Sequence, residues 1–237
     1  MMTVRTTGLR NEEGGPCEDA VLLVDKPLGW TSFDVVNKIR ALTGIRRVGH
    51  AGTLDPLATG LLIVCTGRKT KELSRYTGLD KTYAALITLG GTTESYDAAT
   101  PVVDRRDVSG LSDEAVRGAI GSFVGRQRQL PPMWSAVKVG GRRLYRYARK
   151  GQTVTRPPRD IEISSITVNR ISLPEVAVTV TCSKGTYIRT LAHDIGARLG
   201  CGAYLSGLRR TAIGPFKVDD ALTMQGLVNL TAPAAAR

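Results

Sequence analysis

Residues 49–56 have the sequence Gly-His-Ala-Gly-Thr-Leu-Asp-Pro. Its two glycines permit a close approach of the backbone, and Pro56 restrains the residue before it. Both effects limit the mobility of Asp55. Taken alone, an aspartate before a proline in a loop is more often a turn or capping residue than a reacting group. His50 is equally well explained as a hydrogen-bonded structural histidine.

The segments on either side of this loop predict strands. Residues 21–27 form an apolar run that ends at a Pro-Leu-Gly turn, which is typical of a short buried strand. Alternating apolar residues over 82–89 and 176–182 predict two more strands, because successive strand side chains point to opposite faces. On the first of these, Tyr83 stands at the beginning of the inward face.

Helical spacing of apolar residues predicts helices between these strands. They are the segments from Thr31 or Ser32 to Leu42, with Gly44 as the stop, from the cap Ser112 to Gly125, and from the junction at Tyr187 to Leu199. Strands and helices are interspersed without regular alternation, so we expect an α+β fold with a mixed sheet rather than a doubly wound one.

The composition points to a polyanionic partner. Thirty-three Lys and Arg against 21 Asp and Glu give the 237-residue chain a net charge of +12. The longest apolar run, residues 61–65, is far shorter than the roughly 20 residues of a membrane helix. Residues 1–20 lack the apolar core of a signal peptide, so we expect a cytoplasmic protein.

The cysteines and histidines predict no metal site. Cys17, Cys65, Cys182 and Cys201 show no C-x-x-C spacing, and the chain has two histidines. These residues therefore form no zinc-ligand pattern, and we expect the cysteines to be buried or unreactive thiols.

Positive charge concentrates between residues 115 and 159, which hold eleven Lys or Arg and no Asp or Glu. Aromatic residues are interleaved with them, and residues 142–150 can form a helix with guanidinium groups on one side. Such a surface suits a phosphate backbone with bases stacked on aromatic rings. The alternative is a solvated basic helix whose aromatics belong to the core. Phospholipid is a weaker candidate because a broad apolar face is lacking.

The loop at Asp55 resembles the Gly-His-x-Gly-x-Leu-Asp-Pro-x-Ala-x-Gly signature of the bacterial tRNA pseudouridine synthase B family. Further blocks match this family in the same order, and several ordered blocks are far more specific than one short motif. These blocks are Lys81-Thr82-Tyr83, Pro131 to Lys138, Cys182 to Thr190 and Leu208-Arg209-Arg210. The resemblance covers about residues 21–216.

This resemblance implies that a uridine in the T loop of tRNA, at tRNA position 55, is isomerised to pseudouridine after the base is flipped out. It implies the pseudouridine synthase catalytic fold, with a mixed, largely antiparallel central sheet, and no cofactor. Asp55 matches the family's catalytic nucleophile, Arg189 its charged partner, and Tyr83 the residue that stacks on the target base and handles a proton. His50, Tyr187 and Leu208 match positions that contact the flipped nucleotide or its neighbours.

The expected organisation is a flexible tail over residues 1–20, a catalytic domain over 21–216 with a basic RNA-binding insertion at about 126–159, and a short tail over 217–237. The family's C-terminal RNA-binding domain is then missing or vestigial. We expect a monomer that needs no membrane and no obligate protein partner. Two other functions stay open: a protein that binds or chaperones tRNA, and a hydrolase that uses His50 and Asp55. The hydrolase is the weaker, because no Ser or Cys lies in a nucleophile motif.

Overall fold

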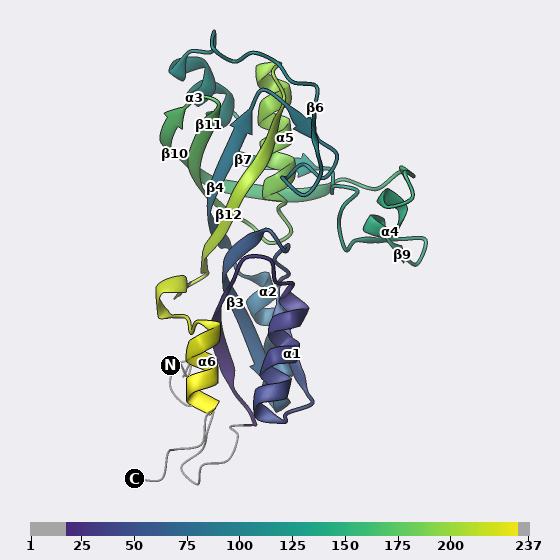
Figure 1. Cartoon of the computed structure of the whole chain (residues 1–237), viewed down its shortest axis with the longest axis vertical. Helices are drawn as coiled ribbons and strands as arrows, with labels where there is room; N and C mark the ends of the chain where they lie inside the picture. The colour runs from purple at the N-terminus through teal and green to yellow at the C-terminus, as the bar shows by residue number, and fades with distance from the viewer. Residues whose placement is uncertain (1–17, 232–237) are drawn as a thin grey trace. The chain divides into compact units, whose positions relative to one another are not determined.

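The computed structural model describes residues 18–231, which fall into two compact units (Figure 1). The first unit comprises the described residues up to Lys81 together with those from Arg209 onward, and the second comprises Thr82–Leu208. Most of the tail expected over residues 1–20, including Cys17, lies outside the described part.

The first unit is built on antiparallel strands with helices on both faces. Its strands are β1 (Val21–Lys26), β2 (Val48–Ala51), β3 (Ala58–Thr66), the end of β12 (Ala203–Ile213) and β13 (Phe216–Lys217). Its helices are α1 (Ser32–Thr43), η1 (Gly67–Glu72), α2 (Leu73–Gly78), η2 (Val218–Asp220) and α6 (Met224–Thr231). Strand β3 pairs antiparallel with both β1 and β2, and β12 pairs with β13.

Apolar side chains cover both faces of this sheet. Val35 and Ile39 of α1 pack with Leu227 of α6 over one face, and Tyr76 of α2 packs over the other. Strand β3 is therefore buried on both sides, which explains the unbroken apolar run at residues 61–65. Thr31 caps α1 in a capping box with Asp34, and Gly44 ends the helix at φ 73°, as the sequence predicts.

The second unit contains sheet strands in the order β12-β4-β11-β10-β7, and β10 pairs antiparallel with both β11 and β7. Its other elements are β4 (Lys81–Leu89), β5 (Thr92–Thr93), β6 (Val102–Val103), α3 (Asp113–Gly121), β7 (Gly125–Gln129), β8 (Lys138–Val139), β9 (Arg142–Arg143), α4 (Leu144–Ala148), β10 (Arg159–Ser172), β11 (Glu175–Cys182) and α5 (Ile188–Leu199). The expected alternation on β4 and β11 is confirmed, since the odd residues of β4 and the even residues of β11 are buried. The α+β class and the largely antiparallel sheet are confirmed as well.

The basic insertion departs from the expected helix over residues 142–150. Arg142 and Arg143 form strand β9, which pairs with β8, and helix α4 begins only at Leu144. Gly140 and Gly141 adopt φ of 57° and 78°, which allows a tight two-residue turn between the two strands. Figure 1 shows α4 and β9 on an arm at the side of the second unit.

Three further boundaries differ from expectation. Helix α3 ends at Gly121, and Gly125, at φ 114°, begins β7 instead of ending the helix. His50 lies in β2, so the expected loop at 50–55 begins only at Gly52. The segment after Phe216, expected as a tail, contains η2 and α6. Within residues 18–231, no helix is long and apolar enough to cross a membrane.

Candidate functional site

The Asp55 loop connects β2 to β3, and its backbone is fixed on both sides of the carboxylate. The Leu54 N–H donates to Ser32 Oγ at 2.9 Å, and the Ser32 hydroxyl donates to the Leu54 carbonyl at 3.2 Å. After the aspartate, the Pro56 carbonyl accepts from the Gly29 N–H at 2.9 Å. The side chain of Asp55 is partly exposed. The loop therefore holds the carboxylate in place while leaving it accessible.

Arg210 of β12 anchors this loop through hydrogen bonds to backbone carbonyls. Its guanidinium is buried, with 1% of the residue exposed, and donates from Nε to the Leu61 carbonyl at 2.7 Å and from Nη2 to the Gly52 carbonyl at 3.1 Å. Gly60 permits the close strand approach, since a Cβ there would lie 2.3 Å from the Arg210 carbonyl oxygen. Arg210 thus joins the Asp55 loop to β3 and β12.

Lys26 places a second buried cation near the carboxylate. It is fully buried, and its ammonium donates to the Trp30 carbonyl at 2.6 Å and the Pro27 carbonyl at 3.0 Å. Burial lowers the pKa of Lys26 to about 8, while the negative charge of Asp55 raises it.

His50 precedes the loop on β2. Burial lowers the pKa of its imidazole, and the nearby Arg210 guanidinium lowers it further. The ring is therefore neutral at physiological pH, which suits contact with a base better than attraction of a phosphate.

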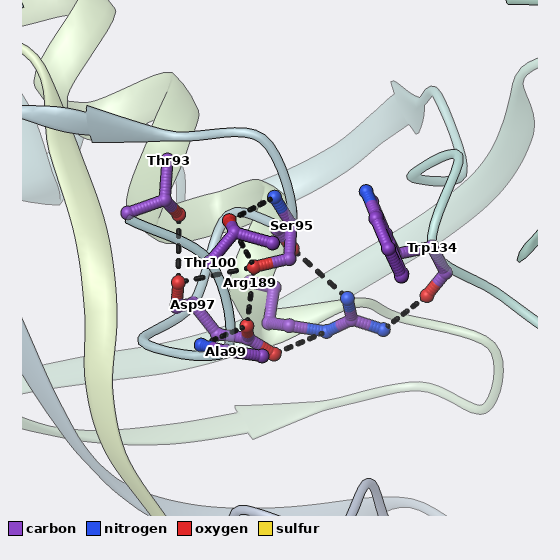
Figure 2. A network of polar contacts seen from close by, with 7 residues as sticks. All are labelled: Thr93, Ser95, Asp97, Ala99, Thr100, Trp134 and Arg189. Atoms are coloured by element: carbon purple, nitrogen blue, oxygen red, sulfur yellow. Dashed lines mark hydrogen bonds and ion pairs between the residues drawn. The ribbon is translucent and has the colours of Figure 1, made fainter. Parts of the chain in front are cut away.

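Arg189 is the centre of a buried polar network in the second unit (Figure 2). Its Nη1 donates to the Ser95 carbonyl at 2.9 Å and its Nη2 to the Trp134 carbonyl at 2.8 Å. Its Nε lies 3.5 Å from Asp97 Oδ2, and both side chains are less than 10% exposed. Arg189 is thereby fixed by two segments of the chain, one at residues 95–97 and one at Trp134.

Asp97 is also fixed by hydrogen bonds from neighbouring residues, in addition to its ion pair with Arg189. Its Oδ1 accepts from the Ser95 hydroxyl at 2.6 Å and from the Ala99 N–H at 2.9 Å (Figure 2). Its carbonyl accepts from the Thr93 hydroxyl at 2.7 Å. The carboxylate is therefore aimed by short local bonds, which limits how far Arg189 can move.

The other expected site residues lie on separate elements of the second unit. Tyr83 is buried on β4, Tyr187 immediately precedes α5, and Leu208 is half-buried on β12. His50 and Asp55 belong to the first unit. The pairing of Arg189 with Asp55 joins residues of different units and stays a prediction.

Sequence reasoning missed Lys26 and Arg210 near the Asp55 loop, and Asp97 beside Arg189. Arg210 lies in a matched motif block, so the sequence marks the residue. The sequence does not show that its side chain is buried. Asp97 carries no motif that would single it out. Its role follows only from the fold, which brings its carboxylate to a buried guanidinium.

The described cysteines, Cys65, Cys182 and Cys201, are buried, as expected. Among residues 18–231, no three His, Cys, Asp or Glu side chains gather where they could hold a metal ion. The expectation that no cofactor is needed stays a prediction.

Comparison with known proteins gives consistent matches. The family model described as TruB family pseudouridylate synthase (N terminal domain) matches residues 40–188, and that of the tRNA pseudouridylate synthase B C-terminal domain matches residues 189–236. tRNA pseudouridine synthase B of Opitutus terrae is 49% identical over 215 residues, covering 91% of this chain and 89% of that protein. That of Burkholderia pseudomallei is 49% identical over 209 residues, covering 88% of this chain and 69% of the relative.

Solved structures show the same fold. A chain in the crystal structure of a Cbf5-Nop10-Gar1 complex has a TM-score of 0.70 and 33% identity, covering 90% of this chain and 54% of that chain. A chain of an H/ACA RNP bound to a substrate RNA containing 2'-deoxyuridine has a TM-score of 0.67 and 29% identity, covering 90% of this chain and 53% of that chain. The present chain thus spans just over half the length of these two solved relatives.

Proposed function

Because the chain belongs to the TruB family of pseudouridylate synthases, we propose that it isomerises one uridine in the T loop of tRNA, at tRNA position 55, to pseudouridine. The family drawn from the sequence motifs is confirmed by these matches. The observation that carries the proposal for this chain is Asp55, a carboxylate in the family motif on a loop whose backbone is fixed at Leu54 and Pro56.

The reaction breaks the N1–C1′ bond of the uridine, turns the detached uracil and joins C5 to C1′, with loss of the C5 proton. A flipped nucleotide held over a fixed carboxylate meets this requirement. Asp55 can add to the sugar, add to the base, or assist removal of a proton at C2′. These routes differ in the bond that Asp55 forms, and all require its ionised form.

The surrounding residues have distinct proposed roles. Arg189 pairs with Asp55 and keeps it ionised, while Tyr83 stacks on the target base and handles a proton. His50, Tyr187 and Leu208 contact the flipped nucleotide or its neighbours, where their surfaces replace lost base stacking. Support comes from the burial of Arg189 and Tyr83, because groups that must be aimed benefit from packed surroundings.

The T arm of tRNA is the proposed partner of the basic insertion. The exposed Arg142, Arg143 and Arg146 can contact phosphates, and the half-buried Tyr145 and Tyr147 flank Arg146. The charge of this segment also supports a second function in holding or refolding tRNA. We further propose that the protein acts as a cytoplasmic monomer without a cofactor.

A T-arm stem-loop that carries tritium at uridine C5 tests the proposal. Isomerisation must release this label, because C5 gives up its hydrogen when it bonds to C1′. The expected result is stoichiometric release from the target uridine and none from a stem-loop with cytidine at that position. A well-bound stem-loop that releases no tritium rejects the enzymatic function and leaves RNA binding.

A further inference from the structure

Gln129 is a buried amide at the root of the basic insertion. It is the last residue of β7, 4% exposed, and the insertion continues directly after it. It lies opposite Arg159 of β10, the strand to which the chain returns after the insertion. Gln129 therefore stands where the insertion meets the sheet.

Both polar atoms of this amide bond to the backbone of one distant residue. Gln129 Nε2 donates to the Tyr187 carbonyl at 3.0 Å, and its Oε1 accepts from the Tyr187 N–H at 2.8 Å. The backbone of Tyr187 is extended, with φ −99° and ψ 107°, immediately before α5. The amide thus takes the place of a partner strand at the point where α5 begins.

The residues after Gln129 contact the same turn of α5. The Thr190 hydroxyl donates to the Leu130 carbonyl at 3.5 Å, and Arg189 donates to the Trp134 carbonyl at 2.8 Å. Arg156, near the end of the insertion, donates to the Pro131 carbonyl at 2.5 Å. Residues 129–134 therefore fasten the root of the insertion to the turn that carries Tyr187 and Arg189.

We propose that Gln129 is a positioning residue for the reaction: its amide fixes the backbone of Tyr187 and so aims Tyr187 and Arg189 while tying the insertion to them. This inference rests on the proposed function, and it adds a residue that touches neither substrate nor reacting atoms. It also gives RNA held by the insertion a short, hydrogen-bonded connection to the active-site arginine.

A glutamine suits this position for a chemical reason. The Tyr187 backbone presents one donor and one acceptor, and a primary amide returns one of each without a charge. An ionised glutamate has acceptors alone and would face the Tyr187 carbonyl with negative charge. A protonated glutamic acid, in contrast, can donate to that carbonyl and accept from the N–H.

Gln129→Glu therefore converts the positioning role into a pH-dependent one. The buried site raises the pKa of the introduced carboxyl, while the exposed Arg159 across the strand pair acts against this shift. We expect single-turnover tritium release to be at least about tenfold slower than wild type at alkaline pH, and to recover as the pH is lowered. The dissociation constant of the T-arm stem-loop should stay unchanged.

Two further variants complete the experiment. Gln129→Met removes both hydrogen bonds without adding charge. Tritium release by this variant should therefore be slow at every pH. Gln225→Glu is the control, because Gln225 lies on α6, outside the insertion, and bonds locally, to Asn229 Oδ1 at 2.9 Å, among the described contacts. This control should keep the wild-type rate and pH profile.

The outcomes separate the two proposals. Wild-type rates in both Gln129 variants, or equal losses of binding and rate without recovery at low pH, overturn the positioning role. If Gln129→Glu does not fold, a wild-type rate of tritium release by Gln129→Met is sufficient to overturn the positioning role. Absence of tritium release from the wild-type protein itself rejects the proposed function instead.

Discussion

Lys26 and Arg189 are buried cations that the protein accommodates in different ways. The Lys26 ammonium is held by backbone carbonyls in the field of Asp55, and burial lowers its pKa to about 8. The Arg189 guanidinium lies beside the Asp97 carboxylate and donates to two carbonyls. A buried charge that loses its partner lowers the free energy of unfolding. A specific prediction therefore follows for each of these two sites.

Asp97→Asn should slow tritium release without weakening RNA binding. The substitution removes the Asp97 carboxylate from beside the Arg189 guanidinium, and breaking a buried ion pair costs on the order of 3–5 kcal/mol. We expect a lower free energy of unfolding in urea and a single-turnover rate at least about tenfold below wild type.

Glu162→Gln is the control for Asp97→Asn. The Arg126–Glu162 pair spans 3.4 Å, close to the Arg189–Asp97 distance, but its side chains are 89% and 50% exposed. An exposed pair is worth about 0–1 kcal/mol, so this variant should be nearly silent. Equal effects of the two substitutions would show that burial does not give the Asp97 pair its importance.

Lys26→Met should change the pH dependence of stability. The folded-state pKa of Lys26, about 8, lies below its ordinary value of 10.5, so the unfolded chain binds more protons between these values. The free energy of unfolding of wild type should therefore rise relative to the variant as the pH passes from 8 to 10.5. Urea titrations across this range measure the difference, and a constant difference would contradict the lowered pKa.

At the scale of elements, α5 depends on a glycine that packs against the start of β12. A Cβ on Gly196 would lie 2.1 Å from the Ala203 nitrogen, whereas Gly118 of α3 has open space around it. Gly118→Ala should stabilise the protein by about 0.5–1 kcal/mol through helix propensity. Gly196→Ala should destabilise it by about 1–3 kcal/mol through overpacking. Thermal unfolding measures both, and stabilisation by both substitutions would contradict the packing of α5.

Elements with a clear apolar period were predictable from the sequence. Helix α1 has its capping residue and glycine stop, and β4 and β11 alternate. Strand β10 was not predictable, because much of its 14-residue length is exposed and shows no sustained alternation. The start of α4 was misplaced because paired glycines at 140 and 141 make a hairpin out of residues that helix propensity favours.

At the scale of the whole molecule, the net charge of +12 predicts salt-dependent binding of RNA. Replacing Arg142, Arg143 and Arg146 together by Gln should lower the slope of log affinity against log salt by up to about 2, at roughly 0.7 per lost contact. Arg170→Gln is the control, because Arg170 lies on β10 and pairs with Glu175 at 3.7 Å. An unchanged slope in the triple variant would place the phosphate contacts elsewhere.

The chemistry of the site was predictable only where a motif marks it. Asp55, Tyr83 and Arg189 were found through matched blocks, whereas Lys26, Asp97 and Gln129 act through burial and contacts between distant segments. Gln129 and Tyr187 are 58 residues apart, and neither position carries a signal of the other. Residue types in a motif can be read from a sequence, but the hydrogen bonds that aim them require the fold.

The most direct test of the central claim compares wild type with Asp55→Asn, which keeps the shape of the side chain and removes its charge. Both proteins are saturated with a T-arm stem-loop tritiated at uridine C5, and release is followed through a single turnover. We predict equal dissociation constants, full release by wild type and none by the variant. Release by Asp55→Asn at the wild-type rate would contradict the assignment of Asp55 as the reacting group.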